Sequence, residues 1–468
     1  YSDALPLLQS LGGAVVPAKW RGGLPITYHV GPSKEKVHLN LAFNWDIKQL
    51  YDVIAKMPGR ELPDEWVIRG NHHDGWVNGA EDPTSGMVAE MEEARAIGEL
   101  AKKGFRPKRT LVFCAWDGEE PALLGSTEWV EDNQEILKQK AVAYINTDGN
   151  NRGFIGAEGS HTLEPFFNEI ISEVTDPQTG VSIKERRYAK TLVDADKAGR
   201  TKLMGDKTLK LSALGAGSDY SPFLQHLGIT SMNLGFGGEG DGGQYHSIYD
   251  SYDYFTRFID PGFAYGAALS KTAGRTMLRL ANADVLPFDF NSFYKTVNDY
   301  ATEVKTLLDN SRVETGQQNK LISDKLFDLA KDPTKQYKIP GVKEEVPYLN
   351  FSNLENQLVL LKAASEEFLK LYPKATTLST DKRNQLNAIL YKAERSLTQQ
   401  NGLPRRSWYR HMIYAPGYYT GYGVKTLPGI REGIEERNWK EAQDNIEIVA
   451  KTLESYTQQV EAANALLK

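Results

Sequence analysis

The stretch VIRGNHHDGW, residues Val67–Trp76, joins an apolar run to a polar end, and this combination decides the fold. The run stops at Gly70, and two histidines and an aspartate follow it. A short apolar run bounded by a glycine predicts a buried strand. A strand that ends in ligand-type side chains is typical of α/β proteins, which bind ligands at the carboxyl ends of their strands.

Similar apolar runs recur along the first part of the chain and alternate with amphipathic segments. This alternation predicts an α/β fold in which helices cover both faces of a sheet. Residues 1–36 are rich in Gly and Pro and are expected to form loops with short strands. We expect further strands at residues 37–43, 66–70, 109–116, 141–148 and 229–236, and helices at residues 86–104, 126–139 and 163–174.

The pattern changes near residues 282–293, beyond which almost no strand signal remains. Apolar residues recur there at helical spacing, which predicts a helical bundle. Two domains are also expected for a chain of 468 residues. We therefore predict an α/β domain at residues 1–286 and an all-α domain at residues 287–468, with helices at 293–310, 353–372, 379–399 and 439–468.

The composition is that of an ordinary globular protein, with 40% hydrophobic and 25% charged residues. The net charge of −6 and the lack of a long basic stretch argue against a nucleic-acid partner. Cys114 is the one cysteine, so no intrachain disulfide can form and cysteine usage leaves the redox compartment undetermined. No apolar run approaches the roughly 20 residues of a membrane-spanning helix.

The residues that could carry chemistry follow the predicted strands of the first domain. Imidazole and carboxylate groups that converge on one edge of a sheet suit zinc when no thiolate is available. Each group alone is weak evidence, but several polar strand ends on one edge are moderately specific. The candidates are His72, His73, Asp74, Glu81, Asp82, Asp117, Glu119, Glu120, Asp148, Tyr245 and His246.

The two adjacent histidines can be partly distinguished by the geometry of an extended chain. Side chains two residues apart point the same way, so Asp74 can lie beside His72. A carboxylate next to a ligating imidazole fixes its tautomer, which favours His72 as the ligand and Asp74 as the residue that orients it. The alternative is that the pair His72–His73 is a solvated turn, and only the other polar strand ends count against that interpretation.

Glu119 and Glu120 form a second adjacent pair. Neighbouring residues at a strand end point to different sides, so one can bind metal while the other acts as a general base toward a metal-bound water. The alternative is that this acidic pair lies in the first turn of a helix, where the helix dipole favours negative charge.

Two other motifs do not support a function. Gly235, Gly237 and Gly240 match G-x-G-x-x-G, but no helix is predicted to start within the motif, as a dinucleotide site requires. The glycines instead suit a loop that approaches a ligand closely and carries Tyr245 and His246. No serine lies in a G-x-S-x-G motif, so a serine hydrolase has little support.

The chain resembles the glutamate carboxypeptidase II and transferrin receptor-like family of co-catalytic zinc peptidases. The resemblance covers nearly all of the chain, in the order of the family, and lacks the family's N-terminal portion. The matching segments are GNHHDGWVNGAEDPTSG, RPKRTLVFCAWDGEEPALLGSTEWVEDN, AYINTDGN, GAGSDYSPFLQHLGI, YHSIYDSYDYF and YRHMIYAPGYYTGY.

The resemblance implies two zinc ions and the residues that hold them. One ion is held by His72 and Asp148, the other by Glu120 and His246, and Asp82 bridges both. Glu119 takes the position of the general base, and Tyr245 that of a hydroxyl that stabilises the oxyanion. We also expect a cis bond between Asp82 and Pro83. Glu128 and Glu131 match two ligands of a structural calcium ion whose other ligands lie upstream of Tyr1.

The substrate pocket implied by the resemblance departs from the family at several positions. Gly217, Ser218 and Tyr422 fall at substrate-binding positions, but Ser218 replaces an asparagine and Gly421 replaces a lysine. The segment TSMNLGFGGEG lacks the arginines that recognise acidic residues. Three functions therefore remain open: a carboxypeptidase, which the resemblance favours, an aminopeptidase on the same metal core, and a catalytically silent receptor or scaffold.

The resemblance also implies an architecture and partners. The expected fold is a zinc exopeptidase-type mixed sheet flanked by helices, followed by a helical dimerisation domain. The expected partners are a peptide substrate, a second copy of the chain and a separate N-terminal fragment of the same protein. Members of the family act outside the cytosol, so an extracytoplasmic location is expected.

Overall fold

The computed structural model describes residues 2–240, 242–334 and 338–468, which form two compact units that divide between Gln49 and Leu50. The first unit contains the helix α1 (Ala4–Gln9), the turn η1 (Ala18–Trp20) and a single antiparallel bridge between Val15 and His29. The strand predicted at residues 37–43 is wrong, because these residues form no strand and are exposed. Their alternating apolar pattern suits a strand, but no described segment supplies the backbone hydrogen bonds that a strand needs.

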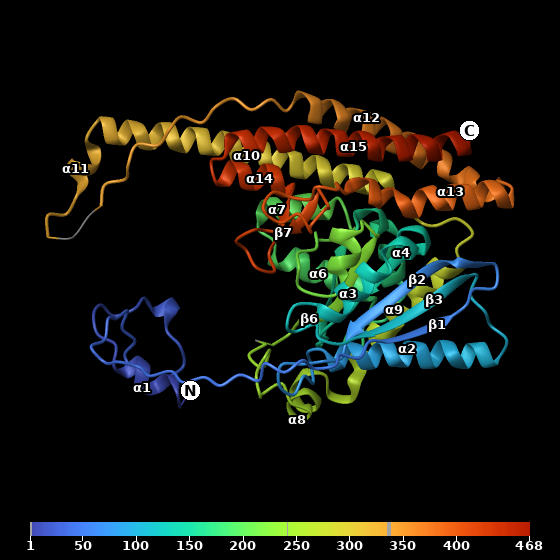
Figure 1. Ribbon diagram of the computed structural model, residues 1–468, viewed down its shortest axis with the longest axis horizontal. Coiled ribbons are helices and arrows are strands. Elements are labelled where there is room, and N and C mark those ends of the chain that lie inside the picture. The colour runs from blue at the N-terminus through green and yellow to red at the C-terminus, as the bar shows by residue number, and fades with distance from the viewer. Residues whose placement is uncertain (1, 241, 335–337) are drawn as a thin grey trace. The chain divides into compact units, whose positions relative to one another are not determined.

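The second unit contains a six-stranded sheet in the order β1–β3–β2–β4–β6–β5 (Figure 1). The four central strands run parallel, and the edge strands β1 and β5 pair antiparallel to their neighbours. This mixed sheet with flanking helices confirms the predicted fold class. The strands are β1 (Val53–Met57), β2 (Leu62–His72), β3 (Arg109–Trp116), β4 (Ala141–Asn146), β5 (Gly153–Gly159) and β6 (Ser231–Gly238).

Helices cover both faces of this sheet, as the pleat of β2 shows. Arg69 pairs with Glu93 of α2 (Thr84–Lys102), so odd-numbered residues of β2 face that helix. A side chain at Gly70 would instead meet Tyr144 and Trp116, so the next residue faces the other layer. Tyr144 stacks on Phe223, which belongs to the π-helical turn η3 (Pro222–His226) of that layer.

The helix predicted at residues 126–139 is two helices, α3 (Leu124–Asp132) and α4 (Gln134–Lys140). They separate at Asn133, whose side-chain amide donates to the Trp129 carbonyl at 2.8 Å. A short polar side chain that bonds the local backbone competes with helix continuation. The remaining helices of this part are α5 (Glu164–Ser172), α6 (Ile183–Asp194), α7 (Lys197–Met204), α8 (Tyr252–Tyr254) and α9 (Ala264–Asn282).

The C-terminal part is mostly helical, as predicted. Its long helices lie side by side in Figure 1, and α12 contacts both α10 and α15. The bounds are α10 (Phe290–Ser323), α11 (Leu326–Ala330), α12 (Ser352–Leu371), α13 (Thr380–Lys392), α14 (Pro428–Glu435) and α15 (Trp439–Leu467). A two-stranded hairpin, β7 (Tyr414–Pro416) with β8 (Val424–Thr426), interrupts them. The domain boundary predicted between residues 286 and 287 stays a prediction. Among the described residues, no helix combines the length and apolar character of a membrane span.

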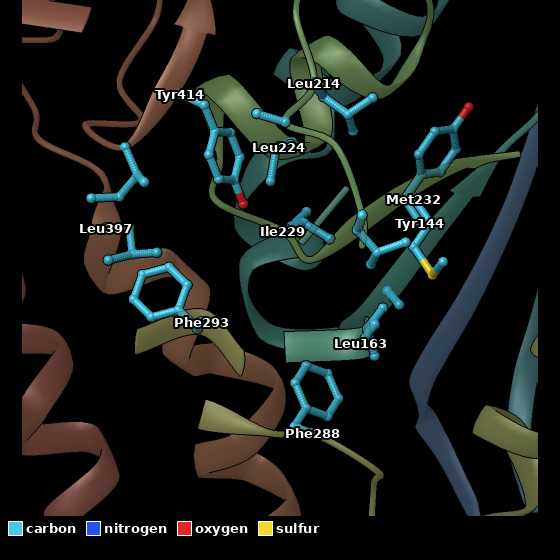
Figure 2. Packing of buried hydrophobic residues seen from close by; sticks show 14 of the residues in the cluster. Tyr144, Leu163, Leu214, Leu224, Ile229, Met232, Phe288, Phe293, Leu397 and Tyr414 are labelled. Carbon is cyan, nitrogen blue, oxygen red and sulfur yellow. The ribbon is translucent and has the colours of Figure 1, made fainter. Parts of the chain in front are cut away.

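The helical part and the sheet share one hydrophobic core. Figure 2 shows Tyr144 of β4 and Met232 of β6 on one side of this cluster and Phe293 and Tyr414 of the C-terminal part on the other, with Leu224 and Ile229 between them. All six side chains are almost fully buried. This shared packing fixes the β7–β8 hairpin relative to the sheet.

Candidate metal centre

Candidate ligands gather at one edge of the sheet because the parallel strands β2, β3, β4 and β6 all end there. His72 is the last residue of β2, and the other candidates follow strand ends or precede α2. Asp82 lies two residues before α2, Glu120 follows β3, Asp148 follows β4, and His246 lies in the loop after β6.

The candidates form two groups that share Asp82. The inner group consists of His72, Asp82 and Asp148, and the outer group of Asp82, Glu120 and His246. In the inner group, His72 Nε2 lies 2.9 Å from Asp148 Oδ1 and 3.4 Å from Asp82 Oδ1. In the outer group, His246 Nε2 lies 3.1 Å from both Asp82 Oδ2 and Glu120 Oε2. The two carboxylate oxygens of Asp82 therefore face different groups.

These separations fit zinc. Ligand atoms arranged tetrahedrally about 2.0–2.1 Å from a zinc ion lie about 3.3 Å from one another. The four pairs given above span 2.9–3.4 Å, and all ligand atoms of each group lie within 4.8 Å of one another. Imidazole nitrogen and carboxylate oxygen are also the donors that zinc takes when thiolate is absent. The residues present therefore fit two zinc ions that share one carboxylate.

The acids of the centre differ in pKa. Burial raises the pKa of Glu119 to about 9, and burial together with the negative charge of Asp82 raises that of Glu120 to about 7. Burial acts in the same direction on Asp148, but its hydrogen bond with His72, the charge of His72 and its bonds with other side chains together lower its pKa to about 2. Crowded acids with raised pKa values are stabilised in their charged form by a nearby cation.

Asp74 contacts the backbone of Glu119 and Glu120 as well as His72, which the sequence predicted that it orients. His72 Nδ1 lies 3.3 Å from Asp74 Oδ1 and 3.1 Å from the Asp74 carbonyl oxygen. The same carboxylate also accepts the backbone N–H of Glu119 at 3.0 Å and that of Glu120 at 3.3 Å. Asp74 therefore holds the imidazole and the acidic turn at once.

Several sequence candidates lie outside the two groups. His73 is exposed and lies near the Tyr51 carbonyl, and Asp117 accepts the Tyr51 N–H at 2.8 Å. Glu81 is buried and accepts from Asn151 at 2.7 Å, and burial raises its pKa to about 8.

The two residues matched to calcium ligands also lie elsewhere. Glu131 accepts the indole N–H of Trp408 at 2.5 Å, and Glu128 is exposed. Neither belongs to a metal group among the described residues.

The predicted substrate-side residues come from three distant segments. The Tyr245 ring stacks on the His246 ring with centroids 3.7 Å apart. Burial raises the Tyr245 pKa, and Tyr422, in the loop of the β7–β8 hairpin, contributes to the same shift. The Ala216 N–H donates to the Tyr422 carbonyl at 3.3 Å, which fastens this hairpin beside Gly217 and Ser218.

Sequence reasoning missed two groups of residues that position the site. Asp250 accepts the backbone N–H of Glu81 at 2.7 Å and that of Asp82 at 3.0 Å, so it ties the Asp82 loop to the loop of His246. Asn146 donates to Ser218 at 2.9 Å, and the Ser218 side chain contributes to the lowered pKa of Asp148. Asp250 and Asn146 both lie in segments quoted for the family resemblance, but neither residue stood out by itself, and Asn146 lies in an otherwise apolar strand.

Three further expectations can be compared with the structure. The bond between Asp82 and Pro83 is cis, as predicted. The first helical turn considered for Glu119–Glu120 is wrong, since α3 begins only at Leu124. Residues 239–240 and 242–251, after the glycines of β6, contain no helix, which agrees with the rejection of a dinucleotide motif.

Comparison with known proteins identifies two parts of the chain. Residues 52–258 match the model of Peptidase family M28, and residues 349–461 match the transferrin receptor-like dimerisation domain. A probable glutamate carboxypeptidase of Arthroderma benhamiae is 34% identical over 459 residues, covering 95% of this chain and 56% of that protein.

Two other relatives carry different functional names. A probable glutamate carboxypeptidase of Arabidopsis thaliana is 31% identical over 428 residues, covering 90% of this chain and 54% of that protein. Aminopeptidase NAALADL1 of Mus musculus is 29% identical over 481 residues, covering 97% of this chain and 59% of that protein.

The chain thus spans a little over half the length of these relatives. The metal groups lie within the first matched part, and the long helices α12 and α15 lie mostly within the second. Residues 52–258 therefore belong to peptidase family M28, and residues 349–461 to the transferrin receptor-like dimerisation domain family.

Proposed function

We propose that this chain is a co-catalytic zinc exopeptidase that hydrolyses a terminal peptide bond, with a carboxypeptidase as the favoured direction. The observation that carries the proposal is Asp82, whose two oxygens face the imidazoles of two different ligand groups. A carboxylate shared in this way suits a pair of cations acting on one substrate.

The chain's own residues have distinct roles in this proposal. His72 and Asp148 would hold one zinc ion, Glu120 and His246 would hold the other, and Asp82 would serve both. When bound, zinc supplies Lewis acidity that lowers the pKa of water and polarises the scissile carbonyl. Asp74 keeps the His72 imidazole in the orientation in which Nε2 faces Asp148 and Asp82.

Glu119 is the general base. Its Oε2 lies 3.8 Å from His72 Nε2, so the carboxylate reaches the space beside the inner group without belonging to either group. It accepts a proton from the attacking water and returns it to the leaving amine. The raised pKa of Glu119 suits this second transfer, and nearby cations lower that pKa enough for the first.

Tyr245 and Tyr422 act on the substrate side. The Tyr245 hydroxyl donates to the oxyanion of the tetrahedral intermediate, and stacking on His246 restricts its ring. Tyr422 reaches the same space from the hairpin and, with Gly217 and Ser218, borders the terminal carboxylate of the substrate. Gly421 and the arginine-free segment of β6 give no support for an acidic side-chain preference.

An aminopeptidase is the second candidate. A basic pocket suits a C-terminal carboxylate, whereas an acidic pocket suits an N-terminal ammonium. Gly421 stands where the family has a lysine, and a relative 29% identical to the chain bears the name aminopeptidase. A catalytically silent scaffold has less support, because the ligand positions and the base are all retained.

The test uses blocked dipeptides and the purified full chain. Hydrolysis of N-acetylated dipeptides indicates a carboxypeptidase, and hydrolysis of C-terminally amidated dipeptides an aminopeptidase. Glu119→Gln is expected to keep two zinc ions per chain and to lose at least about 10³-fold in turnover, because only the base is removed. Turnover retained by this variant would refute the role of Glu119, and a wild-type chain that cleaves neither substrate would refute the enzyme.

Two further parts of the proposal rest on resemblance. The transferrin receptor-like region is proposed to join two copies of the chain, which light scattering of the purified protein would test. An extracytoplasmic location is proposed on the same basis, and localisation of the tagged protein in its source cells would test it.

A further inference from the structure

Behind the inner group, buried polar side chains form a continuous hydrogen-bonded network. Arg69 of β2 donates through Nε to Glu93 of α2 at 3.0 Å and through Nη2 to Thr147 Oγ1 at 2.7 Å. The Thr147 hydroxyl in turn donates to Asn71 Oδ1 at 2.5 Å. Arg69, Asn71 and Thr147 are completely buried.

Each of the three backbone segments that carry an inner ligand is attached to this network. Asn71 precedes His72, and its side-chain amide donates to the His72 carbonyl at 2.8 Å. Thr147 precedes Asp148. The Asn71 amide also donates at 3.3 Å to the carbonyl of Pro83, the residue after Asp82. One connected set of side chains therefore reaches the backbone next to all three ligands.

The network is anchored to the helix that follows Asp82. Arg69 pairs with Glu93 and, at 3.4 Å, with Glu90, and both glutamates belong to α2. Burial raises the pKa of both glutamates, that of Glu90 to about 8, and the charge of Arg69 opposes this rise in each. A buried ion pair adds little net stability compared with apolar side chains of similar size. Its main effect here is to hold β2, β4 and α2 in one relative position.

Glu120 and His246, the two ligands that belong to the outer group alone, have no direct link to this network among the described residues. No hydrogen bond among the described residues joins Glu120 or His246 to Arg69, Asn71 or Thr147. His246 instead adopts a left-handed backbone conformation, with φ of 53°, in a loop.

We propose that Arg69, Thr147 and Asn71 are positioning residues that hold His72, Asp82 and Asp148 at metal-binding separations before the inner cation binds. The inference rests on the proposed zinc function and extends it to three residues that touch neither the cation nor the substrate. In the intact chain the network orders the three ligands before the ion binds. In a variant without the network, ion binding must also order the ligands, so the affinity for the inner ion is lower.

Thr147→Val is the sharpest test, because it removes the central hydroxyl and keeps the side-chain shape. Thr147→Ser is the matched control, because it keeps the hydroxyl and removes a methyl group. Each substitution is combined with His246→Ala, which removes a ligand from the outer group. The measured zinc affinity then reflects the inner group. Zinc dissociation constants are measured by competition with a chromophoric chelator on the full chain.

In the His246→Ala background, Thr147→Val is expected to weaken zinc binding by about 10- to 100-fold, and Thr147→Ser by less than about threefold. In a His72→Ala background, where the outer group reports, Thr147→Val is expected to change the dissociation constant by less than about threefold. Circular dichroism of the metal-free proteins establishes that the variants are folded. If Thr147→Val does not fold, Asn71→Ser, which shortens the donor to His72 and Pro83, replaces it with the same expected loss.

Equal zinc affinity with Val and Thr at position 147 would overturn the inference, and so would equal weakening by Val and Ser. These outcomes differ from a failure of the proposed function. A wild-type chain that binds zinc but cleaves no blocked dipeptide would refute the enzyme alone, and one that binds no zinc would refute both.

Discussion

His72 and His246 approach the same carboxylate from two very different regions of the molecule. His72 ends a central strand, its side chain is 1% exposed, and the residue before it belongs to a buried network. His246 lies in a loop after β6, its side chain is 26% exposed, and its backbone is left-handed. The loop is held chiefly through Asp250, which binds the backbone N–H groups beside Asp82.

The difference shows that the ligand positions of one metal centre can be fixed in two different ways. Ligands on adjacent strand ends have their separation set by sheet geometry and by buried hydrogen bonds. Ligands on loops have theirs set by a few contacts between loops, which cost less to rearrange. We infer that the inner group is the preorganised half of the centre and that the outer group is ordered further by its cation.

The largest effect is expected where the two regions meet. Asp82→Asn removes one charge from both groups, so we expect less than one zinc ion per chain after dialysis. Turnover is expected to fall by about 10⁴-fold or more, beyond the roughly 10²–10³-fold lost with a single oriented donor. Metal analysis and dipeptide hydrolysis check this. Two retained zinc ions would show that Asp82 is not shared.

The next effect separates the two histidines. His246→Ala is expected to keep about one zinc ion per chain and to lose about 10²- to 10³-fold in turnover, because the inner group remains intact. His72→Ala is expected to bind its remaining ion more weakly than His246→Ala does. Chelator titration of both variants measures the order, and the reverse order would contradict the comparison.

A smaller effect tests the crowded interior of the inner region. A side chain at Gly86 would lie 1.9 Å from the Asp148 carbonyl oxygen and 2.3 Å from Asn71 Oδ1. Gly86→Ala is therefore expected to lower the free energy of unfolding by about 1–3 kcal/mol and to weaken inner zinc binding. Gly237→Ala is the control, because nothing lies within 4 Å of a side chain there. Urea unfolding measures the stability of both variants. Equal stability of Gly86→Ala and Gly237→Ala would show that the interior tolerates the methyl group.

The last prediction concerns the stability of the fold rather than the metal centre. It tests His161, which lies outside both metal groups. Burial lowers the pKa of His161 to about 4 from the ordinary value of 6.5. The unfolded chain therefore binds a proton that the folded chain does not, and stability falls as the pH drops from about 6.5 to about 4. Between pH 7.5 and pH 5, His161→Gln is expected to lose about 2 kcal/mol less stability than the wild type. Urea unfolding at both pH values measures the difference, and an unchanged slope would contradict it.

Much of the sheet could be predicted from the sequence, and the exceptions have a common cause. Long apolar runs revealed β2, β3, β4 and β6. The edge strands β1 and β5 were missed, because β1 is short and largely exposed and β5 is rich in glycine, so neither contains a long apolar run. Residues 37–43 show the converse error, since a strand pattern forms no strand without a neighbour among the described segments.

The site was predictable only where a residue's own chemistry pointed to metal. His72, Asp82, Glu120, Asp148 and His246 were named from their types, their places after strands and a family resemblance. Arg69 and Thr147 were not, because their contact spans 78 positions of sequence and neither residue type suggests metal. The contacts between Asp250 and the Asp82 loop span 168–169 positions.

The sequence by itself determined which side chains can bind a cation and that they follow buried strands, because residue chemistry and apolar runs are local properties. Only the tertiary structure decided that the two oxygens of Asp82 face different imidazoles and that a buried arginine steadies one of the two groups. Parallel strands require long crossover connections, so residues that meet at their ends are far apart in the chain. No local pattern can encode such a meeting.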